Sequence, residues 1–576
     1  MLNFDINDSF DGSVDIPEHK LKNIKATIIF KQGKLIDINL FFDTSPNQNI
    51  NDSSIMYFNF KKGSICLADL KASQYNNMLS STNYSFFAKK AIFTYANNFD
   101  WNNFKINKIS LHTSNLNRWL FFSLPEDYVE KIKEIDNYKS QININNIQYN
   151  KHKLSIYDNF IYIKDNKKED LYRLIAKGYI TIEDKDTNFN INEASILIGD
   201  IELLLCVLTG YPQSPITVKF NENMFFYQTN GSHIKVQNPD SHLDFIFWFN
   251  ILNQKNNMQD ILINFFAKTD IIKKTYRGLW GLINNPADDF YDDVFFRIFA
   301  MLDCITKNKS EDIKIPFSDE QKADIKNVLA NIIEKQMTNF PDYNDQYSVI
   351  KERIIESVDY SNGLSYKNRI QYIMKNYLSV EATEIISIDD KTLSKIVKLR
   401  NSFAHLNELP DFFYTEGYQI YNKTLLLIFY LLWKELGIND KVIFANLNRT
   451  FNTLKQACSK QKLDVYNGTP LISLSDGEFN KLLLIKHGHA IPSMEKTYSN
   501  IILEKIKDLY SINVEMTNAF QKNIYSKKYA SVKDYVISLY SPQKYNDITY
   551  VSDIWIENRR TQLNIHGAII IDFSKK

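Results

Sequence analysis

The hydrophobic pattern changes its period near residue 240, and this change constrains the fold more than any other feature of the chain. Before it, short runs rich in β-branched and aromatic residues, such as AIFTYA and KISLHT, are separated by clusters of Asn, Asp, Ser and Gly. Such runs indicate β-strands joined by turns. After it, apolar residues recur every three or four positions, which indicates amphipathic helices. We therefore expect a β-rich part followed by a helical part.

The β-rich part is predicted to contain an early hairpin and one long helix near its end. Residues 26–42 (ATIIFKQGKLIDINLFF) hold two β-rich runs on either side of a Gly-containing turn. Residues 193–209 (EASILIGDIELLLCVLT) have helical spacing, and Gly210 and Pro212 follow as a stop signal. The runs ITVKF and MFFYQT predict two closing strands. We assign residues 1–238 to this N-terminal domain.

The helical part is predicted to be an all-α bundle over residues 239–437. Its segments each show one apolar face, and they are DFIFWFNILNQ, MQDILINFFAK, FFRIFAMLDCITK, DEQKADIKNVLANIIEKQ, YSVIKERIIESV, YKNRIQYIMKNY, KTLSKIVKLRNSFAHL and YQIYNKTLLLIFYLLWKEL. Residues 438–576 are expected to form a small α+β extension. VIFANLNRTFNTLKQACSK and MEKTYSNIILEKIKDLY predict helices, and YVSDIWIENRRTQLNIHGAIIIDF predicts strands. The predicted fold class is α+β multidomain.

Composition narrows the function and the location. The chain has 68 Lys and Arg against 67 Asp and Glu, so the net charge of +1 provides no global basic field for a nucleic acid. The four cysteines are far apart, which argues against a disulfide framework or a cysteine zinc site and favours a reducing compartment. The start lacks the pattern of a signal peptide. The most apolar run, LLLIFYLLW, is too short to cross a bilayer. A cytoplasmic protein without a membrane partner is expected.

The segment KLRNSFAHL at residues 398–406 has the residue types for RNA cleavage without a metal. It contains Arg400, Asn401 and His405 in an R-N-x-x-x-H pattern. Histidine transfers protons near neutral pH, and the planar fork of arginine stabilises charge on a phosphate. Asn401 can orient the imidazole or hold a phosphate oxygen. On an ideal helix Arg400 and His405 lie about 140° apart, so they converge best at a helix end or across a symmetric interface.

Other interpretations of these and other residues remain open. Arg400 and His405 also fit a helix-end salt bridge with a capping histidine. The similar spacing from Arg559 and Arg560 to His566 is interpreted as a strand surface. Two possible metal sites and one possible RNA contact remain, namely Asp288, Asp289, Asp292 and Asp293; His487 and His489; and Lys527 and Lys528. Carboxylates before a helix more often cap it, two histidines alone seldom form a zinc site, and a basic helix face is usually solvated. We expect no metal and no cofactor.

KLRNSFAHL resembles the signature of HEPN domains, and the whole organisation resembles the ApeA-like abortive-infection HEPN proteins. Three further stretches are similar to that family, namely SFDGSVDIPEHKLKNIKATIIFKQGKLIDINL, EASILIGDIELLLCVLTGYPQSPITVKF and LSYKNRIQYIM. The resemblance covers residues 1–437. It implies a β-rich N-terminal domain followed by a HEPN bundle, which agrees with the change of period.

The resemblance also implies a function. It points to cleavage of cellular RNA such as tRNA during antiphage abortive infection, after a phage-derived trigger. From the chemistry of Arg400 and His405 we expect attack by a ribose 2′-hydroxyl, which leaves 2′,3′-cyclic phosphate ends. The resemblance implies a homodimer through the HEPN domain. It further implies an acidic residue near the Arg/His pair, which corresponds to Asp303 in FFRIFAMLDCITK, where the family more often has Glu. The alternative is a non-catalytic HEPN module that binds RNA or dimerises as a sensor or scaffold.

Overall fold

The computed structural model covers the 576-residue chain and describes residues 8–574 with gaps. The gaps are residues 31–34, 43–54, 62, 79–80, 95–99, 102, 114–115, 122–141, 166–172, 212, 214, 222–223, 229–244, 248–251, 253–257, 269, 285–290, 311–317, 360–363, 406–407, 451–452, 486–497, 526–531, 540–544 and 560. The chain divides into two compact units, one of residues 1–377 and 390–446 and the other of residues 378–389 and 447–576.

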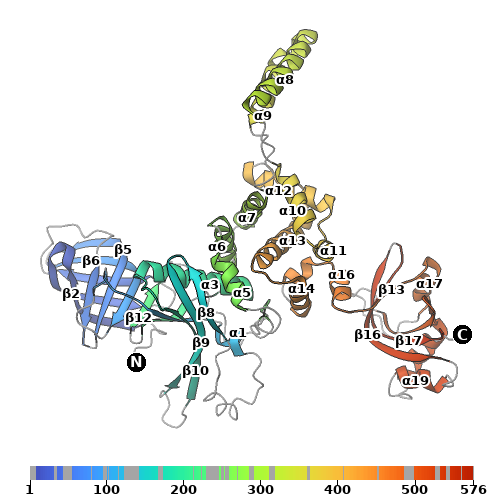
Figure 1. Cartoon of the computed structure of the whole chain (residues 1–576), viewed down its shortest axis with the longest axis horizontal. Coiled ribbons are helices and arrows are strands. Elements are labelled where there is room, and N and C mark those ends of the chain that lie inside the picture. Colours follow the sequence, from blue (N-terminus) through green and yellow to red (C-terminus); the bar gives the residue numbers. More distant parts are fainter. Residues whose placement is uncertain are drawn as a thin grey trace. The chain divides into compact units, whose positions relative to one another are not determined.

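The first unit begins with a twelve-stranded sheet (Figure 1). Its strands are β1 (Asp8–Ile16), β2 (Leu21–Phe30), β3 (Ile36–Phe42), β4 (Met56–Phe60), β5 (Gly63–Met78), β6 (Ser81–Thr94), β7 (Lys108–Thr113), β8 (Asn143–Tyr149), β9 (His152–Asp165), β10 (Arg173–Asp184), β11 (Pro215–Phe220) and β12 (Met224–Gln228). Two short helical segments, η1 (Pro17–His19) and α1 (Leu116–Phe121), lie between strands.

The first six strands close into a barrel. Their order is β3-β2-β1-β4-β5-β6, and β3 also pairs with β6, which joins the two ends. Successive side chains of a strand point to opposite faces, and Ile28, Ile38 and Phe58 are fully buried in the barrel core. The hairpin predicted at residues 26–42 is confirmed, because β2 and β3 pair antiparallel with Ile28 opposite Ile38.

The remaining strands continue the sheet in the order β12-β11-β7-β10-β9-β8, and α3 (Ile191–Thr209) is the long helix of this region. A capping box begins α3. The side chain of Asn190 accepts a hydrogen bond from the backbone amide of Glu193, and the side chain of Glu193 accepts one from the backbone amide of Asn190. The helix ends at Gly210, whose φ of 73° is left-handed. The predicted helix and its stop signal are therefore confirmed.

The helical bundle completes the first unit (Figure 1). Its elements are α5 (Met258–Phe266), α6 (Asp270–Asn284), α7 (Tyr291–Lys309), α8 (Asp319–Asn339), η3 (Pro341–Tyr343), α9 (Asn344–Asp359), α10 (Tyr366–Tyr377), α12 (Asp390–His405), α13 (Phe412–Glu435) and α14 (Asp440–Arg449). α13 is buried from Leu426 to Trp433, and the indole of Trp433 donates to the carbonyl of Val207 in α3 (3.2 Å). Among the helices that the structure describes, none is long and apolar enough to cross a membrane.

One predicted helix of the bundle is wrong at its start. Within residues 244–254, Phe245 has no regular structure, and Ile246 and Phe247 form a bend instead of helix. The amides of Ile246 and Phe247 donate to the carbonyls of Thr209 and Leu208, so this segment pairs with the end of α3.

The second unit is α+β. Its elements are α11 (Val380–Ile386), α15 (Thr453–Ala457), α16 (Lys460–Tyr466), β13 (Leu471–Ser473), α17 (Asp476–Asn480), η4 (Lys481–Leu484), β14 (Tyr498–Ile506), β15 (Leu509–Ile512), α18 (Val514–Tyr525), α19 (Val532–Leu539), β16 (Asp547–Glu557) and β17 (Gln562–Asp572). The strands form one mixed sheet in the order β13-β16-β17-β14-β15. The helix predicted over residues 494–510 is wrong, because β14 and β15 occupy that stretch. The predicted fold class, with a β-rich N-terminal part, an all-α bundle and an α+β extension, is confirmed.

The second unit includes a segment taken from within the bundle sequence. α11 lies between α10 and α12 in the chain, yet it packs against α16 of the second unit. Ile385 and Ile386 of α11 are buried, and the carbonyl of Ile385 accepts the amide of Ser459 (2.7 Å). Glu384 pairs with Lys462 at 3.0 Å. The chain therefore enters and leaves the second unit immediately before α12 begins.

Candidate active site

The R-N-x-x-x-H motif occupies the last two turns of α12. Leu393, Ile396 and Leu399 are the buried face of this helix, which packs against α7, α10 and α13. α12 ends at His405, within one residue of the end of the helical segment KTLSKIVKLRNSFAHL expected from the sequence. Asn401 and His405 are exposed, whereas Arg400 is half-buried on the side of the apolar face. Because the backbone is helical from Arg400 to His405, the two side chains leave the helix about 140° apart.

An aromatic cluster holds the last turn of α12 in place. The ring of Phe403 is stacked on Phe295 of α7, with centroids 5.5 Å apart and an interplanar angle of 17°. Phe403 also contacts Phe413 of α13 edge-on, at 5.9 Å. Phe403 is two residues before His405, so the packing of this ring on two helices fixes the backbone that carries the histidine.

Arg400 lies over the ring of Tyr366, the first residue of α10. Its guanidinium carbon is 5.4 Å from the ring centre, which is within the range of a cation–π interaction. One of its terminal nitrogens also donates to the side-chain oxygen of Asn401 (3.2 Å). Two contacts within the same chain therefore orient the guanidinium before any ligand binds.

Tyr366 is buried, with 8% of its surface exposed. Its hydroxyl has no hydrogen-bond partner among the described residues. Burial raises the pKa of this hydroxyl, the charge of Asp303 raises it further, and Arg400 and Arg369 oppose the change. The ring that Arg400 contacts is consequently a neutral phenol at physiological pH.

Asp303 forms ion pairs with Arg369 of α10 and with Lys307 one turn further along α7 (2.8 Å). The side chains of Asp303 and Arg369 are 16% and 14% exposed. Arg369 also donates to the carbonyl of Leu364 (2.7 Å), and its guanidinium carbon lies 5.8 Å from the Tyr366 ring centre. The influence of Asp303 on the motif therefore passes through Arg369 and Tyr366.

Sequence reasoning singled out Arg400, Asn401, His405 and Asp303, and missed Tyr366 and Arg369. The structure brings Arg400 and Asp303 to α10, through Tyr366 and Arg369, and it leaves Asn401 and His405 exposed. Tyr366 and Arg369 are one helical turn apart at the start of α10, so both reach the same side of that helix. An aromatic and an arginine at this spacing were the available signal, within LSYKNRIQYIM.

The structure describes only some of the other sequence candidates. Among the residues that the structure describes, no group of three or more His, Cys, Asp or Glu is arranged to hold a metal. Asp293 pairs with Arg297 one turn away (2.6 Å), as helix-start carboxylates commonly do. His566 pairs with Asp553 on the neighbouring strand (2.6 Å), and both are exposed, so it belongs to a strand surface as expected. The remaining candidates lie outside the described residues or side chains, namely Asp288, Asp289, Asp292, His487, His489, Lys527 and Lys528.

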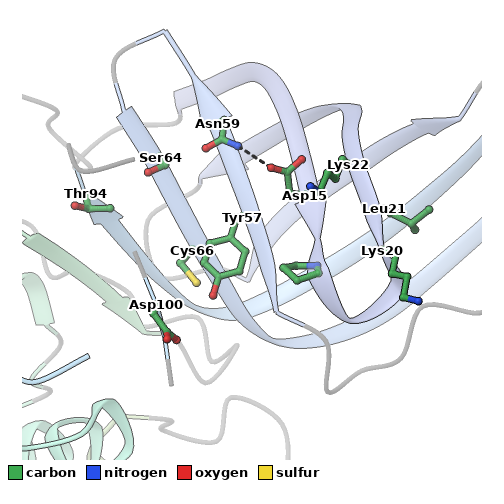
Figure 2. Close-up of a pocket in the computed structure, with 11 residues that line it drawn as sticks. Asp15, Lys20, Leu21, Lys22, Tyr57, Asn59, Ser64, Cys66, Thr94 and Asp100 are labelled. Carbon is green, nitrogen blue, oxygen red and sulfur yellow. Dashed lines mark hydrogen bonds between the residues drawn. The ribbon is translucent and has the colours of Figure 1, made fainter. Parts of the chain in front are cut away.

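A separate cavity of about 640 Å³ lies beside the barrel strands (Figure 2). Its polar lining includes Lys20, Tyr57, Cys66 and Asp100, and Asp15 accepts a hydrogen bond from Asn59 (3.4 Å). Burial raises the pKa of the Cys66 thiol, so this group stays protonated and is a poor nucleophile. The cavity has the size of a small-molecule pocket, but its cations and carboxylates select no one class of ligand.

Comparison with known families covers both parts of the first unit. The family model for ApeA N-terminal domain 1 matches residues 9–265. The family model for Apea-like HEPN matches residues 298–442, which include most of α7 and all of α10 and the motif helix α12. Neither a curated protein nor a solved structure matches the chain. The two matches, in this order and on this fold, show that the chain belongs to the ApeA-like HEPN family.

Proposed function

We propose that this chain is a metal-independent endoribonuclease of antiphage abortive infection, built on residues 1–238, 239–437 and 438–576 as three domains. Its family indicates an antiphage-defence nuclease of the HEPN type. The observation that carries the proposal is the end of α12, which combines an exposed His405 with an Arg400 guanidinium oriented by two contacts. The substrate is cellular RNA in the cytoplasm, and tRNA is the first species to test.

The proposed reaction is attack of a ribose 2′-oxygen on the adjacent phosphorus. The bond from the 2′-oxygen to phosphorus forms, and the bond from phosphorus to the 5′-oxygen breaks. A base takes the 2′-hydroxyl proton and an acid protonates the leaving 5′-oxygen, which leaves a 2′,3′-cyclic phosphate and a 5′-hydroxyl. His405 is the proton-transfer group, Arg400 stabilises the charge on the phosphorane, and Asn401 holds a phosphate oxygen or the imidazole.

The reaction needs two copies of α12. A single His405 can act as the base and then, once protonated, as the acid, so the need for a second copy is geometric. Arg400 and His405 of one helix leave it about 140° apart. A two-fold axis beside α12 places the Arg400 of one chain near the His405 of the other. We therefore propose a homodimer through the HEPN bundle, released for activity by a phage-derived trigger that the N-terminal or C-terminal domain senses.

The rival function is a HEPN module that binds RNA or dimerises without catalysis. The observation in its favour is that Arg400, Asp303 and Arg369 are all engaged in contacts within the chain. Such contacts are also what a purely structural arginine would make.

Cleavage of RNA by purified protein separates these functions. Wild type is compared with Arg400→Ala and His405→Ala, in excess EDTA, with His566→Ala as a matched control for loss of an exposed histidine. We expect wild type and His566→Ala to leave cyclic-phosphate ends, and each motif variant to be at least about 100-fold slower. Full activity of either motif variant would contradict the site. Activity that returns only with Mg²⁺, leaving 5′-phosphates, would contradict the mechanism.

A further inference from the structure

Two guanidinium groups lie against one buried aromatic ring in the bundle. Arg400 of α12 is 5.4 Å and Arg369 of α10 is 5.8 Å from the centre of the Tyr366 ring. Two like charges so close to one ring repel each other unless one of them is neutralised. Asp303 provides that neutralisation, because its carboxylate pairs with Arg369. The arrangement leaves Arg400 as the arginine of the cluster whose charge is available to a ligand.

We propose that Tyr366 is the positioning residue of Arg400, and that Asp303 acts on the reaction indirectly by holding Arg369 beside the same ring. This inference rests on the proposed function, in which Arg400 stabilises the phosphorane. An arginine side chain has several rotatable bonds and is catalytically useful only if its planar fork is aimed before the substrate arrives. The ring of Tyr366 provides a fixed surface on one side of the guanidinium, and the oxygen of Asn401 fixes its edge.

The ring and the hydroxyl of Tyr366 have separable roles. The hydroxyl is buried and has no partner among the described residues, so it contributes no hydrogen bond that orients Arg400. A cation–π interaction needs only the ring, and phenylalanine supplies a ring of nearly the same shape. Tyr366→Phe therefore keeps the positioning surface, whereas Tyr366→Leu removes it and keeps an apolar side chain.

The experiment compares single-turnover cleavage by full-length Tyr366→Phe, Tyr366→Leu and Tyr372→Leu over a range of protein concentrations up to saturation. Tyr372 is a half-buried tyrosine further along α10, in edge contact with Tyr377, and serves as the matched control for loss of a ring from this helix. We expect Tyr366→Phe and Tyr372→Leu to cleave within about twofold of wild type. We expect Tyr366→Leu to be about 10- to 100-fold slower at saturation, with the KM for RNA changed less than about threefold, as for loss of orientation without loss of binding.

A second readout does not depend on activity. With ¹⁵N-labelled arginine, the side-chain signal of Arg400 is assigned by its disappearance in Arg400→Ala, and the Tyr366 ring current shifts it. That signal should move in Tyr366→Leu and stay in Tyr366→Phe. An unmoved signal in Tyr366→Leu, or a wild-type cleavage rate for that variant, overturns the inference. Equal slowing in Tyr366→Phe would assign the effect to the hydroxyl, and equal slowing in Tyr372→Leu to general destabilisation, and either result also overturns it.

The failure of the proposed function would look different. Arg400→Ala keeps the Tyr366 ring, so full activity of Arg400→Ala overturns the site itself and, with it, any catalytic role for Tyr366. The ring-current measurement would then still report whether Tyr366 seats Arg400 in the folded protein.

Discussion

The carboxylate of Asp303 pairs with the guanidinium of Arg369, which joins α7 to α10, and both of these helices pack against the motif helix α12. The two side chains are mostly buried, so the pair is weakly screened by solvent. It follows that Asp303 stabilises the bundle as well as the arrangement of cations around Tyr366.

Asp303→Asn is expected to lower the free energy of unfolding of the bundle by about 1.5–3 kcal/mol, the usual contribution of a hydrogen bond to a charged group. Asp293→Asn is the matched control, since its pair with Arg297 is an exposed pair on the same helix and should contribute below about 0.5 kcal/mol. Denaturant unfolding of both variants measures the difference. Equal losses would contradict the structural importance of the pair with Arg369.

Glu202 of α3 makes the free energy of unfolding depend on pH. The residue is partly exposed, but its carboxyl group is enclosed, and burial raises the pKa to about 8. Between the usual glutamate value and about pH 8 the unfolded state has released this proton and the folded state retains it. The free energy of unfolding therefore falls as the pH rises through this window, with a limiting slope of about 1.4 kcal/mol per pH unit.

Glu202→Gln removes this dependence, because glutamine has no proton to release. Relative to wild type, the variant is expected to gain stability steadily from pH 5 to pH 8 and to change little further above that. Thermal unfolding of both proteins at pH 5, 6, 7, 8 and 9 measures the difference in Tm. A difference that is constant across this range would show that the carboxyl is not enclosed in the folded protein.

Ile385 tests whether α11 belongs to the second unit. Ile385 is 1% exposed, and Ile385→Ala is expected to cost about 2–5 kcal/mol, as for other large-to-small changes in a core. Hydrogen exchange should show the loss of protection in β14 and β17 rather than in α13. Val380→Ala, on the same helix at a residue that is 75% exposed, is the control and should leave exchange unchanged. Loss of protection confined to α13 would place α11 energetically with the bundle.

Much of the fold could be predicted because local patterns and tertiary packing agree. Gly210 follows α3 in the left-handed conformation that its stop signal implied, and Leu393 and Ile396 are buried on one face of α12 as their spacing indicates. In these elements one face is buried and the other is solvated, so the spacing of apolar residues in the sequence matches the repeat of the helix.

The prediction failed where a strand is buried on both faces. Ile501 and Leu503 of β14 belong to one core cluster and Ile502 to another, so three consecutive apolar residues are buried on alternating sides. Such a run lacks the alternation of apolar and polar residues that indicates a strand. With the charged residues that follow it, such as Lys505 and Lys507, the segment shows the spacing of apolar and polar residues typical of an amphipathic helix. The cluster around Tyr366 was missed for another reason. Its members come from α7, α10 and α12, and only the packing of these helices brings them together.

The central claim is that Arg400 from one chain and His405 from its partner complete one site. Mixing inactive Arg400→Ala and His405→Ala proteins tests this most directly. In the heterodimer one site then has both intact residues and the other has neither, so random exchange should restore about a quarter of wild-type activity, a count that follows from two-fold symmetry. Subunit exchange is confirmed independently, by pull-down through a tag on one variant. A mixture that exchanges subunits and stays as inactive as either variant alone would contradict the claim.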